Sequence, residues 1–174
     1  MASTHIRSAR PLDLDNLAVL EVEAGQSFHS VGMPEVAEAV PDREALCRSQ
    51  RQGLIWVAEE QGEIAGFIVA TVLDGNAHIE RVSVAPAFAR QGIGHQLISH
   101  VEHWGRSNSR PATTLTTFRD VPWNGSYYKT LGYQELSGSE IGSEVSAEMR
   151  HDASMPGIDA SRRCAMIKRN GGAS

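Results

Sequence analysis

The amino-acid sequence predicts an α/β (α+β) fold in which a mixed central sheet carries helices on both faces. Apolar runs at 54–60, 63–73 and 77–84, separated by short turn sequences, indicate three antiparallel strands in succession. A segment of helical period follows, and then a further strand at 113–118, a short helix and a final hairpin. This order does not give a purely parallel sheet, so a mixed sheet covered by helices accommodates it best.

The N-terminal part of the chain is predicted to hold one short strand and two helices, over 6–9, 13–25 and 42–52. Pro11 begins the first helix, whose apolar residues line one face. Asp42 is a favourable N-cap for the second helix, and Gly53 ends it. The intervening segment 25–41 is mixed in composition and rich in turn residues.

Turn residues divide the remainder of the chain. We expect Gln61-Gly62 and Asp74-Gly75 to connect the three successive strands. A helix is predicted after the glycine loop, over 92–107, and a short helix ends at Gly132. A long exposed excursion at 137–155 and an edge strand at 162–168 complete the chain.

Composition favours a single soluble globular domain. Of the 174 residues, 41% are apolar and 21% charged, so the chain is long enough to bury a core without metal or disulfide staples. We expect one domain over 1–174, with its core at about 6–168 and a frayed tail at 170–174. The net charge of −5 comes without a basic tract, which argues against nucleic acid and fits a cationic or neutral substrate.

No feature indicates export, a membrane or a metal. Cys47 and Cys164 lie far apart, so no disulfide framework is implied, and both are expected to be buried small apolar residues. Met1–His5 lack the apolar stretch of a signal peptide, and no apolar run approaches the ~20 residues of a membrane helix. The expected location is cytoplasmic. Three histidines lack a metal-binding pattern and are expected to face solvent: His95, His100 and His103.

Residues 84–97, V-A-P-A-F-A-R-Q-G-I-G-H-Q-L, carry the most specific functional signal. A strand, a glycine loop and a helix in that order make an anion site, because the first turn of a helix has unpaired N–H groups and partial positive charge. Glycine lets a phosphate approach the backbone, and Arg90 can add charge. The stretch is neither a P-loop nor a dinucleotide fingerprint, since Leu97 stands where the third glycine belongs. A glycine-rich turn without a ligand is the alternative.

A second motif, Y-Y-K-T-L-G-Y at 127–133, supplies the context. Together the two motifs resemble the GNAT superfamily of acyl-CoA-dependent N-acetyltransferases. In that family a Gln/Arg-x-x-Gly-x-Gly/Ala loop holds the coenzyme A pyrophosphate, and a later tyrosine lies beside the thioester sulfur. Ala89 replaces the usual first residue of the loop motif, and Thr130 replaces the common lysine of the second motif. The resemblance covers roughly 6–168.

The resemblance implies a GNAT-like, mostly antiparallel sheet of about six to seven strands and acetyl-CoA as cosubstrate, without a metal. It also implies that backbone and side chains of two segments hold the coenzyme. These cofactor-binding residues are Val82, Val84, Arg90, Gln91, Gly92, Ile93, Gly94, His95, Asn124 and Tyr128. For Asn124, capping of the following helix is an equally good interpretation.

Acetyl transfer to an amine requires a base for the amine and an acid for the departing thiolate. His78 and Glu80 fall where arylalkylamine N-acetyltransferases carry two acid/base histidines, which gives a likeness to arylalkylamine and polyamine-type members. A buried Glu80 would have a raised pKa, so we expect it to be the base, with His78 assisting. The alternatives are an ion pair of Glu80 with Arg81 or Arg119, and a solvated His78.

Tyr128 matches the family tyrosine that donates a proton to the leaving sulfur. Aromatic packing is the alternative, because Tyr127 and Tyr133 are close in sequence and one tyrosine must belong to the core. Segment 25–41 is the candidate specificity loop. Four other side chains are candidates for the wall of an acceptor pocket: Phe28, Met33, Phe118 and Trp123.

The sequence therefore predicts an N-acetyltransferase that moves an acetyl group from acetyl-CoA to a primary amine by direct attack in a ternary complex. The expected acceptor is a small-molecule amine or polyamine. The alternatives are a protein or peptide N-acetyltransferase and a non-catalytic acyl-CoA-binding sensor. The family often forms homodimers, so a homodimer is also an expectation.

Overall fold

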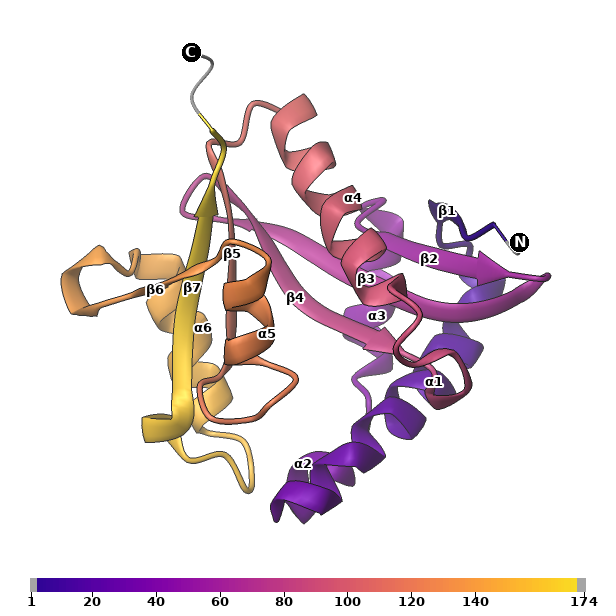
Figure 1. The fold of residues 1–174 in the computed structure, drawn as a ribbon, viewed down its shortest axis with the longest axis horizontal. Coiled ribbons are helices and arrows are strands. Elements are labelled where there is room, and N and C mark those ends of the chain that lie inside the picture. The colour runs from indigo at the N-terminus through magenta and orange to yellow at the C-terminus, as the bar shows by residue number, and fades with distance from the viewer. Residues whose placement is uncertain (1–2, 172–174) are drawn as a thin grey trace. The chain divides into compact units, whose positions relative to one another are not determined.

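The computed structural model describes residues 3–171. Its centre is a seven-stranded sheet with the strand order β1-β2-β3-β4-β5-β7-β6 (Figure 1). Neighbouring strands pair antiparallel in β1–β2, β2–β3, β5–β7 and β6–β7, whereas β4 and β5 pair in parallel. The predicted mixed, mostly antiparallel sheet is confirmed. The strands are β1 His5–Ser8, β2 Ile55–Glu60, β3 Glu63–Leu73, β4 Asn76–Val84, β5 Ala112–Phe118, β6 Gln134–Leu136 and β7 Arg163–Arg169.

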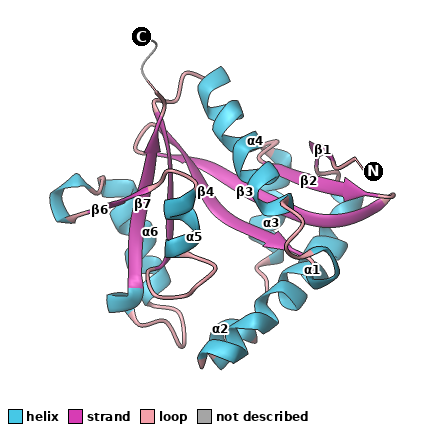
Figure 2. Cartoon of the chain, viewed as in Figure 1, coloured by secondary structure: helices cyan, strands magenta, loops and turns pink. Residues whose placement is uncertain are grey.

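Helices connect the strands wherever a hairpin does not (Figure 2). The chain forms two compact units: one comprises the residues up to Thr71 together with Glu80–Val101, and the other comprises Val72–Ile79 and the chain from Glu102 onward. Strand β4 contributes to both. The helices are α1 Leu14–Gly25, α2 Pro34–Ala37, α3 Arg43–Arg51, α4 Ile93–Ser107, α5 Gly125–Thr130 and α6 Ser143–Ala153.

In the first unit, helices cover both faces of β2 and β3 (Figure 1). Helices α1 and α3 pack on one face through a buried apolar cluster that includes Leu17, Leu46, Val57 and Phe67. The opposite face meets α4 at Gly66, where an added Cβ would lie 3.4 Å from the side chains of α4. The predicted helices and their apolar faces are therefore confirmed in this unit.

Tight turns join the first three long strands as the sequence predicts. Gln61 and Gly62 have φ values of 52° and 84°, and Asp74 and Gly75 have values of 50° and 79°. Two consecutive residues at positive φ give the turn geometry whose twist matches that of an antiparallel hairpin. The glycine at the second position makes this conformation cheap.

In the second unit, α6 and α5 lie on opposite faces of β5 and β7 (Figure 1). Val145 and Met149 of α6 pack against Ala165 and Ile167 of β7. The prediction that the last strand lies at the sheet edge is wrong, because β7 pairs with β5 on one side and with β6 on the other. The short strand β6 forms the edge; it pairs antiparallel with β7, as the predicted final hairpin requires, although helix α6 lies between the two strands in the chain.

The segment 137–155 is mostly exposed, as predicted, although Val145 is buried. It contains helix α6, which is capped from a distant turn rather than by its own sequence. The backbone N–H groups of Glu144 and Val145 each donate to the Asp74 carboxylate, at 3.0 Å. A Cβ at Gly142 would overlap this carboxyl group. The partner lies on the β3–β4 turn, so local sequence could not reveal it.

Three smaller expectations also have structural outcomes. Asn170 is not frayed, because its N–H donates to the Pro111 carbonyl at 3.0 Å; residues 172–174 of the predicted tail lie outside the described part. Cys164 is buried as expected, whereas Cys47 is only half-buried, and both are free thiols. Within residues 3–171, no helix is long and apolar enough to cross a bilayer.

Candidate active site

The glycine loop has a backbone shaped for an anion. Arg90 and Gly92 both adopt left-handed conformations, with φ values of 61° and 79°, on either side of Gln91. Helix α4 follows at once, and its first-turn N–H groups have no partner within the helix. The loop therefore precedes the positive end of a 15-residue helix.

Packing holds this helix end in a fixed place. Ile93 and Leu97 are buried and face Gly66 on β3. A Cβ at Gly66 would lie 2.8 Å from the Ser83 carbonyl oxygen, so only glycine permits this close approach. The side chain of Ile93 anchors the helix in the core, while its backbone N–H belongs to the first turn of the helix.

The remaining loop side chains are open to solvent. Arg90, Gln91 and His95 are exposed, and Gly94 is half-buried. An incoming phosphate would therefore meet the backbone without displacing packed side chains, and the guanidinium of Arg90 would add charge.

Strand β4 differs from what simple alternation predicts. Ala77, His78 and Ile79 are buried in succession, and Glu80 is exposed. The expectation of a buried carboxylate at Glu80 is therefore wrong, and its reason is that the burial along this strand does not follow a period of two. Val82 and Val84 are half-buried.

The two arginines considered as ion-pair partners of Glu80 pair with other carboxylates. Arg81 donates to Glu21 at 2.7 Å, and Arg119 donates to Glu135 at 2.6 Å. The second oxygen of Glu21 is buried and has no hydrogen-bond partner among the described residues. Arg81 and Glu21 both belong to the first unit, and Arg119 and Glu135 both belong to the second.

His78 lies in the core of the second unit. Its side chain is 1% exposed, and its Nδ1 is 2.8 Å from the Thr114 hydroxyl oxygen. Burial lowers the pKa of His78 to about 4, against the opposing charges of Asp152 and Asp74. The imidazole is therefore neutral at pH 7, in place of the solvated histidine considered as an alternative.

The structure distinguishes the three tyrosines of the second motif. Tyr133 is buried and donates its hydroxyl to Glu102 at 2.9 Å, so it is a core tyrosine, as Tyr128 also is. Tyr127 is half-buried. Tyr128 is 6% exposed and lies between the other two rings, with centroid distances of 5.6 Å and 5.7 Å. Burial, with a smaller contribution from Tyr127, raises the pKa of Tyr128, so its phenol is protonated at neutral pH.

His78 and Tyr128 belong to opposite faces of the sheet in the second unit. His78 contacts the side chain of Thr114, whereas Tyr133, which packs against Tyr128, contacts the hydroxyl of the adjacent Thr113. Successive residues of a strand point to opposite faces. The two side chains therefore do not form one acid-base pair.

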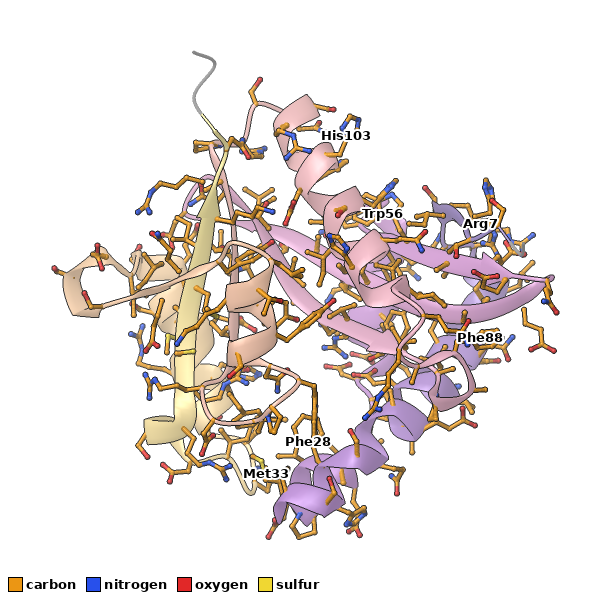
Figure 3. The ribbon with its side chains drawn as sticks, in the orientation of Figure 1. Arg7, Phe28, Met33, Trp56, Phe88 and His103 are labelled. Carbon is orange, nitrogen blue, oxygen red and sulfur yellow. The ribbon has the colours of Figure 1, made fainter. Side chains whose placement is uncertain are left out.

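Several further site residues have clear positions. Asn124 occupies the N-cap position of α5, but its side chain makes no capping hydrogen bond. His95 and His103 are exposed as predicted, whereas His100 is half-buried and packs on Trp56 with a centroid distance of 5.3 Å. Figure 3 shows these side chains against the ribbon, including Trp56 and His103. In the described part of the chain, no set of three or more His, Cys, Asp or Glu side chains could hold a metal ion.

The candidate acceptor-pocket residues fall in both units. Phe28 and Met33 lie together on the segment between α1 and α2, where the Met33 N–H donates to the Phe28 carbonyl at 3.0 Å (Figure 3). Met33 is buried and Phe28 half-buried; in the second unit Phe118 is buried and Trp123 is partly exposed. Met33 and Phe118 are therefore core residues as they stand.

Sequence reasoning missed two charged residues beside the tyrosines, Glu102 and Lys168. Glu102 is 7% exposed, and Lys168 donates to both of its oxygens, at 3.2 Å and 3.1 Å. A signal was present in the sequence. Glu102 lies four residues after Ile98, on the apolar stripe of α4, where a carboxylate needs a partner.

Solved structures share this fold. The chain is 17% identical to the N-acetylglutamate synthase from Neisseria gonorrhoeae complexed with coenzyme A and N-acetyl-glutamate, at a TM-score of 0.73, over 97% of this chain and 35% of that one. It is 16% identical to the ribosomal-protein-S18-alanine N-acetyltransferase from Escherichia coli, at a TM-score of 0.71, over 99% of this chain and 97% of that one. A third structure, the PaiA N-acetyltransferase from Thermoplasma acidophilum in complex with coenzyme A, matches at 16% identity and 0.71 over 97% and 99%.

These similarities place the chain among proteins with an acetyltransferase fold. Residues 17–133 match the acetyltransferase (GNAT) family. The matched region runs from α1 through the glycine loop to the tyrosine motif at 127–133 and makes up more than half of the chain. The protein therefore belongs to the GNAT acetyltransferase family and is an acyltransferase, as the two motifs predict.

Proposed function

We propose that the protein transfers an acetyl group from acetyl-CoA to a primary amine by direct attack in a ternary complex, and that the acceptor is a small amine or polyamine. The observation that carries this proposal is the glycine loop, in which Arg90 and Gly92 adopt positive φ immediately before a long helix. A phosphate group matches the N–H groups at such a helix end in size and charge.

The first unit would hold the coenzyme. The N–H groups from Gln91 to His95 would bind the pyrophosphate, with the Arg90 guanidinium as a further contact. By likeness to the family, the N–H groups of Val82 and Val84 would hold the pantetheine arm and polarise the thioester carbonyl. Asn124 is an additional candidate contact, which its uncommitted side-chain amide supports.

Glu80 is our candidate for the base. An alkylamine with a pKa near 10.4 is less than about 0.1% unprotonated at pH 7, so the proton must be removed before attack. The exposed carboxylate of Glu80 would take it, directly or through water, as the amine nitrogen forms its bond to the acetyl carbon. We do not assign His78 to this step, because its side chain is buried against Thr114 and a pKa of about 4 makes its imidazole a weak base.

Tyr128 is our candidate for the acid. When the tetrahedral intermediate collapses, the carbon–sulfur bond breaks and the thiolate receives a proton from the phenol. A thiol has a pKa near 8.5, and burial raises that of Tyr128 above its ordinary value. Proton transfer to the free thiolate is therefore uphill, so we place it in concert with departure of the sulfur.

The charge of the chain bears on the nature of the acceptor. The net charge of −5 favours a cationic substrate. The names of similar proteins state different acceptors, since one is an N-acetylglutamate synthase and another acetylates a ribosomal-protein alanine. A peptide N-terminus or lysine therefore remains the second candidate.

Calorimetric titration with acetyl-CoA, followed by a thiol-release assay, tests the proposal. The acceptor panel contains monoamines, polyamines, amino acids and peptides with free N-termini. Micromolar binding and turnover on a small amine support the proposal, and turnover on peptides alone replaces the acceptor class. Binding without any turnover indicates the acyl-CoA sensor. Absence of binding contradicts the role of the glycine loop.

A further inference from the structure

A buried ionic cluster surrounds the end of helix α5. It consists of Glu102 from α4, Tyr133 after α5 and Lys168 from β7, which we call the Glu102 cluster. The carboxylate accepts from the Tyr133 hydroxyl at 2.9 Å and from the Lys168 ammonium at 3.1 Å. Glu102 and Tyr133 are 7% and 2% exposed, so these bonds lie out of reach of most solvent. The cluster ties three elements of the second unit to one carboxylate.

The Glu102 cluster is connected directly to Tyr128. The Tyr133 N–H donates to the Tyr128 carbonyl at 3.1 Å, and the two rings meet edge to face at a centroid distance of 5.7 Å. Gly132, which directly precedes Tyr133 in the chain, has a φ of 95°, and a Cβ there would lie 3.5 Å from the Lys168 side chain. The lysine stem therefore supports the turn that returns the chain from Tyr128 to Tyr133.

Stability alone gives a poor reason for this arrangement. Burying the Glu102 carboxylate costs desolvation energy that its bonds to Tyr133 and to the partly exposed Lys168 repay only in good geometry, and an apolar side chain of similar volume often serves as well. A buried ionic network has one low-energy arrangement, whereas apolar contacts allow several. An acid that must transfer its proton as the carbon–sulfur bond breaks needs such a fixed position, because a displacement of 1 Å can cost about 100-fold in rate.

We propose that the Glu102 cluster is a positioning device that holds the Tyr128 hydroxyl for proton transfer to the leaving sulfur. This inference rests on the proposed function of Tyr128. Tyr133 and Glu102 do not touch the reacting atoms and act through Tyr128. Tyr133→Phe keeps the ring packing and removes the hydroxyl, with its bonds to Glu102 and Thr113, so it tests the positioning role.

A double-mutant cycle tests this role. We expect Tyr133→Phe to lower kcat about tenfold while the KM for the amine and the affinity for acetyl-CoA stay unchanged. In a Tyr128→Phe background the same substitution should have no further effect on kcat. Tyr127→Phe is the matched control, because it removes the hydroxyl of the other neighbouring tyrosine, and it should leave kcat unchanged.

Other outcomes overturn the inference. An equal loss of kcat in both backgrounds would show that Tyr133 does not act through Tyr128, and an unchanged kcat in folded Tyr133→Phe would remove its role. If that variant fails to fold, the comparison of Lys168→Arg, which should retain kcat, with Lys168→Met, which should not, replaces it. A wild-type protein without turnover contradicts the proposed function itself, so the two failures are distinguishable.

Discussion

Under the proposed function, the glycine loop and helix α5, which we call the tyrosine helix, would contact a ligand by opposite means. The loop offers backbone N–H groups, and its side chains at Arg90 and Gln91 are exposed. The tyrosine helix offers one phenol, Tyr128, enclosed by two other rings. A site made of backbone should tolerate side-chain truncation and fail when φ is changed. A site made of a buried side chain should fail on loss of a single oxygen atom.

The largest effect is expected from Tyr128→Phe. Removal of a general acid costs typically 10²–10⁴-fold, so we expect kcat to fall at least about 100-fold. The affinity for acetyl-CoA, measured by calorimetry, should change little because the ring remains in place. A parallel loss of coenzyme affinity and kcat would show that Tyr128 serves binding or packing rather than proton transfer.

A pH titration of stability tests the buried side chains of the second unit. His78 has a pKa of about 4 when folded and about 6.5 when unfolded, so the unfolded chain binds more protons between these values. The free energy of unfolding should therefore be highest above pH 6.5 and fall by up to about 3 kcal/mol as the pH decreases to 4. Urea unfolding of the wild type and of His78→Gln measures it.

The control is the pH dependence of the free energy of unfolding in the variant. His78→Gln should be less stable at pH 7 but lose most of the pH dependence between 6.5 and 4. If the variant keeps the full slope, other groups titrate in this range and the burial of His78 does not cause it.

Gly92→Ala tests the backbone site. The φ of 79° disfavours any Cβ by about 1–2 kcal/mol, so the loop should shift and the Kd for coenzyme A should rise about tenfold or more. Gly53→Ala is the matched control, because Gly53 has a φ of 73° and equally open surroundings in the same unit. Both variants should lose similar stability, and only the first should lose affinity; equal Kd values would remove the loop from the binding site.

The smallest effect concerns the cap of α6. Asp74→Ala removes the acceptor of the Glu144 and Val145 N–H groups, and the free energy of unfolding should fall by about 1–2 kcal/mol. Gly142→Ala should also destabilise, since its Cβ would overlap Asp74, whereas Gly138→Ala meets no atom within 4 Å. Destabilisation by Gly138→Ala of the same size would show that replacement of any glycine in this segment, and not overlap with the cap, is responsible.

The features predicted correctly from sequence are those that local chemistry determines. The turn pairs Gln61-Gly62 and Asp74-Gly75 specify hairpins by themselves. The strand–loop–helix arrangement of the glycine loop could be predicted because its three parts are contiguous in the sequence. The environment of Glu80 was mispredicted, because a period of two says which residues share a face but not which residues are covered.

What sequence could not predict depends on distant partners. The distinction between Tyr128 and Tyr133 rests on Glu102, 31 residues before Tyr133. The inner position of β7 depends on which strand docks beside it, and the helix at 143–153 depends on a cap from another turn. In each case a side chain or backbone group remote in the sequence decides the local outcome.

The cap on α6 also has a consequence for the order of folding. The hydrogen bond from Glu144 to Asp74 closes a loop of 70 residues, and such a closure carries an entropy cost that must be met before the bond forms. Helix α6 should therefore complete its first turn only after the β3–β4 hairpin has formed. Hydrogen exchange at the Glu144 and Val145 amides would report the assembly of the whole second unit rather than fraying of a surface helix.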